Sequence, residues 1–248
     1  MGQAAPRAMD VHIEKTNLLR EIEAQADPHY EAVIRRSIPS SLEVYGLRVF
    51  EIRKIVGAWR REHQDADLDD LLLLVEALWA GPSREERVVA LELLQHYPDS
   101  IPQLTWEHFD HWRRDLDNWE LTDVLGLGVL GVWVAGDQEH RAQHLWDLIA
   151  GEDVWSRRLG LVGGIGLNRA LQTVESATLA LEMVDLVKEE RHPLITKAVS
   201  WTLRALGTRH PEQVLAYLEA HEEALARHVV REVTNKLTTG RKDGSPKR

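Results

Sequence analysis

The chain has 248 residues, of which 44% are hydrophobic and 28% are charged, so it can form one or two soluble domains with a sizeable core. It contains no cysteine, which excludes disulfides, thiol catalysis and cysteine-ligated zinc. Its net charge of -10, taken over the whole chain, argues against a nucleic-acid-binding protein.

The charge is distributed unevenly along the chain. Residues 1–150 carry 27 acidic and 15 basic side chains, whereas residues 151–248 carry 13 acidic and 15 basic ones. Only the C-terminal part can therefore offer phosphate groups a favourable electrostatic field.

The sequence has no feature of a secreted or membrane protein. The first residues (MGQAAPRAMD) lack the hydrophobic segment of a signal peptide. The longest uncharged apolar run, residues 124–136, is shorter than the roughly 18 residues of a membrane span. We therefore expect a cytoplasmic protein that does not enter a membrane.

Apolar residues recur at helical spacing, most clearly in residues 68–79 (LDDLLLLVEALW), 84–96 (REERVVALELLQH) and 211–226 (PEQVLAYLEAHEEALA). Glycine and proline interrupt the chain at short intervals, and strand-type alternation is absent from the sequence. This spacing predicts an all-α protein of antiparallel helix pairs of roughly 35–45 residues, the period of HEAT-like repeats. An ordinary helical bundle is the alternative.

The same pattern predicts the organisation of the chain. We expect a flexible N-terminal tail (residues 1–10), a single helical domain (residues 11–239) and a disordered basic tail (residues 240–248, GRKDGSPKR).

A helix is predicted to begin after Asn118, which is a favourable N-cap residue. Trp119 and Asp123 are one helical turn apart and fall almost opposite the predicted core stripe. That stripe consists of Leu121, Val124, Leu125, Gly128 and Val132. The helix therefore presents an indole and a carboxylate together, away from the face that should bury them.

Residues 193–206 (PLITKAVSWTLRAL) repeat this arrangement. Trp201 lies opposite the core stripe, together with Lys197 and Arg204. The predicted core stripe is Ile195, Val199, Leu203 and Leu206. Exposed aromatic rings with nearby cations are typical of nucleic-acid grooves, and a solenoid offers such a groove along one helix layer. The alternatives are that each tryptophan packs against a neighbouring helix, and that Asp123 is only a salt-bridge partner.

Three motifs in order carry a resemblance to a known family: W-x-x-x-D at Trp119 and Asp123, W-x-x-R at Trp155 and Arg158, and KAVSWTLRAL with Trp201 and Arg204. This order resembles the AlkD-like DNA alkylation-repair glycosylases, from about residue 45 to the last predicted helices. The resemblance implies a right-handed superhelical solenoid of HEAT-like helix pairs that holds duplex DNA in its concave face.

The resemblance also implies a reaction. It predicts a monofunctional glycosylase that hydrolyses the N-glycosidic bond of cationic alkylated purines, such as 3-methyladenine and 7-methylguanine, without flipping the base into a pocket. We expect such an enzyme to act as a monomer, with no cofactor and no metal. Alkylation makes the purine a good leaving group, and the transition state places positive charge on the sugar.

The site residues implied by the resemblance follow from this chemistry. Asp123 would stabilise the sugar cation and orient the attacking water, and the indoles of Trp119 and Trp201 would hold the cationic nucleotide. The residues expected at the flanking phosphates are Arg158 and Arg204, with Lys197 and Arg157 as further candidates.

The sequence departs from the family pattern in places. Asn118 stands where a second aromatic residue is expected, and Tyr30 and Tyr45 are both candidates for an N-terminal cleft tyrosine. The acidic N-terminal part, which includes DADLDD at residues 65–70, is unlike a strong DNA-binding protein. Two alternative functions follow: a non-catalytic relative that binds damaged or branched DNA, and a helical-repeat scaffold for other proteins.

Two further motifs have simpler interpretations. The glycines of residues 160–166 (GLVGGIG) lack a preceding strand, so they indicate close helix packing rather than a dinucleotide-binding loop. His140 and His144 are one helical turn apart, but no third ligand accompanies them, so they indicate a solvated helix face rather than a metal site.

Overall fold

The structure is a computed structural model that describes residues 9–245. Within this range the regular secondary structure is helical, apart from one isolated bridge between Glu43 and Ser83, so the predicted all-α class is confirmed. The chain divides into two compact units, Met1–Gln103 and Leu104–Arg248. One domain over residues 11–239 stays a prediction. Residues 1–8 and 246–248 of the two predicted tails lie outside the described residues.

Residues 9–103, the described part of the first unit, contain five α-helices and a short 3₁₀ helix: α1 (Val11–Ala24), α2 (Pro28–Ser37), α3 (Val49–Glu62), α4 (Leu68–Trp79), α5 (Arg84–His96) and η1 (Pro98–Gln103). The predicted helices at residues 68–79 and 84–96 are confirmed with the same bounds as α4 and α5. Each begins at a side-chain cap: Asp67 accepts from the first turn of α4, and Ser83 forms a capping box with Glu86 in α5.

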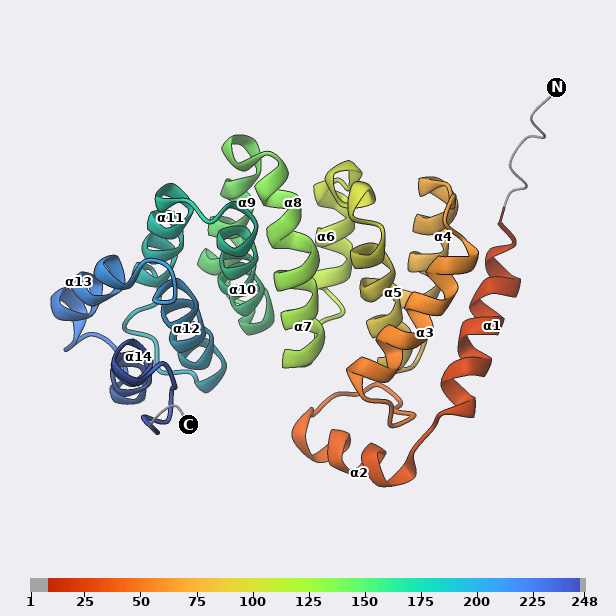
Figure 1. Cartoon of the computed structure of the whole chain (residues 1–248), viewed down its shortest axis with the longest axis horizontal. Coiled ribbons are helices and arrows are strands. Elements are labelled where there is room, and N and C mark those ends of the chain that lie inside the picture. Colours follow the sequence, from red (N-terminus) through yellow and green to blue (C-terminus); the bar gives the residue numbers. More distant parts are fainter. Residues whose placement is uncertain (1–8, 246–248) are drawn as a thin grey trace. The chain divides into compact units, whose positions relative to one another are not determined.

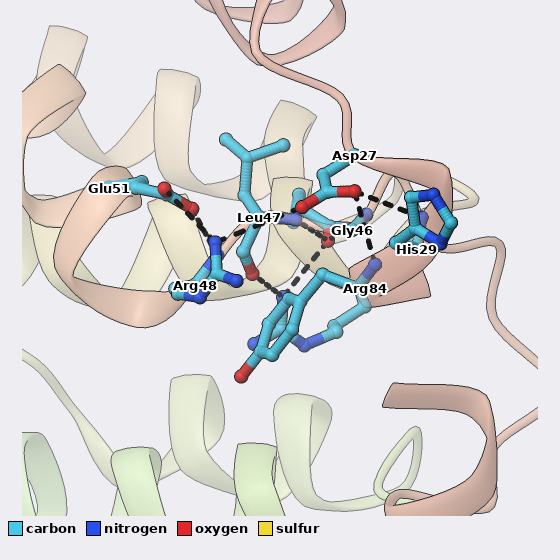
Figure 2. A network of polar contacts seen from close by, with 9 residues as sticks. Asp27, His29, Gly46, Leu47, Arg48, Glu51 and Arg84 are labelled. Atoms are coloured by element: carbon cyan, nitrogen blue, oxygen red, sulfur yellow. Dashed lines mark hydrogen bonds and ion pairs between the residues drawn. The ribbon is translucent and has the colours of Figure 1, made fainter. Parts of the chain in front are cut away.

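A buried ion pair holds the long loop between α2 and α3. Glu85 is fully buried, and its carboxylate accepts hydrogen bonds from the backbone N–H groups of Tyr45, Gly46 and Leu47. Arg84 donates to the Leu47 carbonyl at 2.8 Å (Figure 2). It also donates to Glu85 at 2.9 Å. The backbone N–H groups of residues 45–47 are thus paired where Gly46 and Leu47 are buried, as buried polar groups require.

The second unit contains the remaining helices: α6 (Trp106–Arg113), α7 (Trp119–Leu125), the π-helical turn η2 (Gly126–Leu130), α8 (Gly131–Gly136), α9 (Gln138–Ala150), α10 (Val154–Leu171), α11 (Val174–Asp185), α12 (Pro193–Leu206), α13 (Pro211–His221) and α14 (Arg227–Thr239). The helix predicted over residues 211–226 ends earlier, at His221. The chain turns there, with Leu225 buried in the turn, to bring α14 back against α12.

Short loops join neighbouring helices such as α9 and α10, which makes them antiparallel pairs. Within this unit, α10 packs against α7, η2 and α8 on one side and against α12 on the other, and α12 packs against α14 (Figure 1). We call α7–η2–α8, α10, α12 and α14 the parallel layer. Contacts from helix to helix recur at sequence separations of 35, 36 and 32 residues, close to the predicted repeat length.

The glycines of α10 allow the parallel layer to pack closely. A Cβ atom on Gly131 of α8 would lie 2.6 Å from backbone atoms of Gly163, Gly166 and Leu167. A Cβ on Gly166 would lie 2.6 Å from the Leu127 carbonyl oxygen. Since backbone atoms cannot move aside as a flexible side chain can, only glycine fits here. The prediction of helix-packing glycines in residues 160–166 is confirmed.

The π-helical turn η2 changes which residues of this helix are buried. Before the turn, Leu121 and Leu125 are buried as predicted. The turn contains an extra residue, so the faces rotate relative to a regular helix. Of the rest of the predicted stripe, Val124 before the turn, Gly128 within it and Val132 beyond it are only half-buried. The residues that replace them in the core are Val129, Leu130, Trp133 and Val134.

Together, α7, η2 and α8 form one continuous helical stretch, Trp119–Gly136. Its 18 residues and mean hydropathy of 1.3 make it long and apolar enough to cross a membrane by length and composition alone. The uncharged run at residues 124–136 is only part of this helical stretch, so the sequence analysis underestimated its length. With 56% of the stretch buried inside the fold, its packing is typical of a core helix.

Gly166→Ala is expected to lower the free energy of unfolding by about 1–3 kcal/mol, because the added methyl group meets backbone atoms of the neighbouring helix. Urea unfolding followed by circular dichroism measures the change. Gly57→Ala is the matched control. Its Cβ would meet only side-chain ends at 3.9 Å, and alanine raises helix propensity there. Equal losses in both variants would contradict the close-packing explanation.

Candidate functional site

All seven residues predicted for the site lie on the parallel layer. Trp119 and Asp123 are on α7. The remaining residues are Arg157 and Arg158 on α10, and Lys197, Trp201 and Arg204 on α12. The layer therefore brings the three sequence motifs onto adjacent helices, as the predicted repeat architecture requires.

Asp123 and Arg158 form a two-pronged ion pair between α7 and α10. The Arg158 Nε and Nη2 atoms each donate to one Asp123 carboxylate oxygen at 2.8 Å. The Arg158 side chain is 7% exposed and that of Asp123 is 16% exposed. This bidentate geometry fixes the plane of the carboxylate while leaving part of it accessible to solvent.

Burial and neighbouring charges act on Asp123 in opposite directions. Burial raises the pKa of its carboxyl group, and the Glu120 charge raises it further. The hydrogen bonds and charge of Arg158 lower that pKa, but they do not cancel the effect of burial. The net effect is an Asp123 carboxyl group with a pKa above its usual value.

Arg158 also reaches the first turn of α12, because its Nη1 atom donates to the Leu194 carbonyl at 2.7 Å. All three nitrogens of its guanidinium therefore have acceptors within the protein. Contact of Arg158 with a phosphate stays a prediction, but it would have to compete with these bonds. The contacts favour a different role, in which Arg158 orients Asp123 and ties three helices of the layer together.

The two tryptophans differ in their surroundings. Trp119 is 36% exposed, which agrees with its predicted position opposite the core. Trp201 is half-buried, and the guanidinium of Arg169 lies 6.0 Å from its ring centroid. Along α12, Trp201 lies about 10 Å beyond Leu194, the residue that Arg158 contacts. Convergence of both indoles on Asp123 stays a prediction.

The other predicted cations are held to different degrees. Lys197 is exposed. Arg157 donates to the Ile149 carbonyl and pairs with Glu190 at 2.8 Å. Arg204 contacts Ser200 and Glu232 through its Nε atom only. The sequence analysis did not identify Glu190 and Glu232 as ion-pair partners, because each lies in a segment outside the motifs.

Arg169 is a further cation that the sequence analysis missed. It is exposed near the end of α10, over the Trp201 ring. The signal that could have found it is its position three turns after Arg158, which places both arginines on related faces of α10.

The two candidate N-terminal tyrosines lie in the first unit. Arg48 places its guanidinium over the Tyr30 ring at 4.3 Å from the centroid. Figure 2 shows the same arginine beside Glu51, to which it donates from its backbone N–H at 2.7 Å. Tyr45 is half-buried, and burial raises the pKa of its hydroxyl group.

The two histidines of the 140/144 pair lie in different surroundings. His140 is exposed beside Asp137 at 2.8 Å, as predicted for a solvated face. His144 departs from that prediction because it is half-buried and stacks on Trp106 with ring centroids 4.0 Å apart. Across residues 9–245, no group of three or more histidine, aspartate or glutamate side chains could hold a metal ion.

The second unit is therefore an all-helical stack whose parallel layer carries a carboxylate, indoles and cations on adjacent helices. Comparison with known families shows where such a chain belongs. The family model described as "DNA alkylation repair enzyme" matches residues 18–237. The chain belongs to this family, whose repair function implies DNA as the substrate.

A solved structure supports the fold. The chain is similar to a protein described as "Predicted DNA alkylation repair enzyme from Enterococcus faecalis", with a TM-score of 0.68 and 20% sequence identity. The match covers 86% of this chain and 97% of that chain. At this identity, the likeness establishes the fold alone. No curated protein sequence matches this chain.

Asp123→Asn is expected to lower the free energy of unfolding by about 2–4 kcal/mol, because it leaves the buried Arg158 charge without a counter-ion. Adding Arg158→Met should cost less than the two single changes summed. Urea unfolding of the four proteins measures the coupling.

Asp185→Asn is the matched control for this cycle. The Asp185 side chain is 47% exposed in its pair with Lys188, so its loss should change the free energy of unfolding by no more than about 1 kcal/mol. Additive effects of Asp123→Asn and Arg158→Met would show that the pair is not energetically coupled.

Proposed function

We propose that this protein is a monofunctional DNA glycosylase that removes cationic alkylated purines, such as 3-methyladenine and 7-methylguanine, from duplex DNA. The observation that carries the proposal is the Asp123 carboxylate. Asp123 is the acidic residue of the family's W-x-x-x-D motif. Two hydrogen bonds from Arg158 orient its carboxylate, and its side chain remains 16% exposed.

The reaction is hydrolysis of the bond between C1′ of the deoxyribose and the purine nitrogen. Alkylation at ring nitrogen three or seven gives the base a positive charge, so the bonding electron pair leaves with the base and neutralises it. Water adds to C1′ and loses a proton, which leaves an abasic sugar and the free base. The positive charge moves from the base to the sugar in the transition state.

Asp123 suits the stabilisation of that developing charge. A fixed carboxylate needs no reorganisation when the sugar becomes positive, and partial burial strengthens its field. Each carboxylate oxygen has two acceptor positions. One per oxygen is used by Arg158, so each oxygen retains a position that can accept a hydrogen bond from the attacking water.

The remaining site residues would bind the DNA around the lesion. The exposed face of Trp119 suits a cationic purine, since a cation–π contact contributes about 0.5–2 kcal/mol. Trp201 is the second indole in this role. Lys197 and Arg204, both on α12, would contact flanking phosphates, whereas Arg158 would act as a positioning residue. We expect the enzyme to act as a monomer.

A second candidate function is favoured by the same ion pair. If Arg158 holds both Asp123 oxygens so firmly that water cannot reach them, the protein would bind alkylated or branched DNA without cleaving it. The test below separates the two functions, because binding and base release are measured on the same duplex.

Incubation with a duplex that contains 7-methylguanine should release the free base, and Asp123→Asn should slow the release at least about tenfold, because a neutral amide does not stabilise the sugar cation. Chromatography of the free base measures the rate. Single-turnover conditions with saturating protein separate chemistry from binding.

Asp147→Asn is the matched control, since Asp147 is an exposed carboxylate on α9 of the same unit. It should release the base at the wild-type rate. Salt-dependent binding by wild type without any base release would support the non-catalytic alternative.

Base release should also depend on pH. Because the pKa of Asp123 is raised, the ionised form needed for catalysis is lost at a higher pH than an ordinary aspartate would show. The rate should therefore fall on the acid side from above the usual aspartate range. Since Arg158 lowers this pKa, Arg158→Met should move the fall to still higher pH.

The measurement is the single-turnover rate from about pH 4 to pH 8, less the rate without protein, with folding checked by circular dichroism at each pH. Arg157→Met is the control, because Arg157 pairs with Glu190 and not with Asp123. An acid limb that Arg158→Met leaves in place would contradict the assignment of this pKa to Asp123.

A further inference from the structure

Arg204 is held along one edge only. Its Nε atom donates to the Ser200 hydroxyl at 3.2 Å, and that hydroxyl donates to Glu232 Oε2 at 2.6 Å. The distance from Arg204 Nε to the same Glu232 oxygen is 3.7 Å. Ser200 therefore stands between the guanidinium and the carboxylate as a hydrogen-bonded bridge.

This arrangement differs from that of Arg157 and Arg158 on α10. Arg158 uses Nε, Nη1 and Nη2 on acceptors within the protein, and Arg157 gives Nη1 to Glu190. In residues 9–245, the side-chain contacts of Arg204 all involve Nε. Its two terminal nitrogens are left for a ligand, and its side chain is 21% exposed.

We propose that Ser200 and Glu232 are positioning residues that hold the Nε edge of Arg204 so that its terminal nitrogens bind a DNA phosphate. The proposal deepens the DNA-binding part of the proposed function and rests on it. It also makes α14, which carries Glu232, part of the DNA-binding site.

The chemistry of the guanidinium supports this assignment. A phosphate binds best to two parallel N–H groups of one guanidinium edge. A carboxylate placed directly against that edge would occupy it, as Asp123 occupies the Nε and Nη2 edge of Arg158. The Ser200 bridge keeps the Glu232 charge near Arg204 without blocking the terminal nitrogens.

The cluster is also rigid. Ser200 is 1% exposed, and Ser200 and Arg204 are one turn apart on α12. Close packing of Gly207 against Leu237 holds α12 and α14 together one turn further along. A side chain that is already ordered loses less entropy when it binds a phosphate. Burial lowers the pKa of Arg204, and the nearby Glu232 charge opposes this shift without cancelling it.

The competing explanation is that Ser200 and Glu232 merely join α12 to α14. Salt-dependent binding to an unmodified duplex, measured by fluorescence anisotropy, separates the two explanations. Arg204→Ala should reduce the slope of log affinity against log salt by about 0.9, the value for one phosphate contact. Ser200→Ala should weaken binding about fivefold, because the Nε edge loses its acceptor.

Glu232 offers a charge-matched comparison. Glu232→Gln and Glu232→Ala both remove the negative charge, but only glutamine can still accept the Ser200 hydrogen bond. Binding by the alanine variant should be about three- to tenfold weaker than binding by the glutamine variant. Glu219→Ala, which removes an exposed charge from α13, is the control for charge alone and should not weaken binding.

The decisive measurement introduces Ser200→Ala, Glu232→Gln and Glu232→Ala into the Arg204→Ala protein. If these substitutions weaken DNA binding through Arg204, they should have no effect on affinity there. Losses that persist there, equal binding by the two Glu232 variants, or an unchanged salt slope in Arg204→Ala would each overturn the proposal. Base release does not enter this test. Wild type that binds DNA but releases no base would therefore contradict the catalytic proposal alone, whereas absence of binding would overturn both.

Discussion

The bidentate ion pair between Asp123 and Arg158 is the interaction on which the site depends. It places a carboxylate at the meeting point of α7 and α10, and through the Leu194 carbonyl it also fixes the start of α12. A buried charge pair is costly to desolvate and contributes little net stability. Its value here is positional: the carboxylate keeps its charge, its orientation and part of its exposure, which together suit stabilisation of a cationic sugar.

Close packing of parallel helices makes that interaction geometrically available. Glycines of α8 and α10 meet backbone to backbone, so the side chains of adjacent repeats reach one another across the layer. The three arginines predicted for the site differ in their contacts. All three guanidinium nitrogens of Arg158 donate to acceptors within the protein, and Arg157 pairs with Glu190 through Nη1. Within residues 9–245, Arg204 donates only from Nε, to Ser200. Under the proposed function, the nearby carboxylates would therefore decide which of these cations can contact DNA, and net charge alone would not.

Several features could be predicted from local pattern. Helices α4 and α5 were bounded correctly because a cap residue precedes an uninterrupted apolar periodicity in each. The core stripe of α12 was predicted correctly for the same reason. The stripe of α7–α8 was right for Leu121 and Leu125 and wrong for Val124, Gly128 and Val132. From Gly126 on, a π-helical turn adds a residue that a regular period does not anticipate. The helix over residues 211–226 was extended too far, since its last apolar residue, Leu225, is buried by a turn.

The sequence by itself determined the helical class, the repeat length and the motif residues, since these depend on residue type and spacing along the chain. Which hydrogen-bond and ion-pair partners each motif side chain has was decided only by the tertiary structure. From the sequence, Arg158 was predicted to bind a phosphate. In the structure, its guanidinium instead donates to three acceptor atoms of α7 and α12. The sequence did not reveal that Glu190 lies 2.8 Å from Arg157 or that Glu232 lies 3.7 Å from Arg204. The residues of each pair are about thirty positions apart, so their contact depends on how the repeats stack.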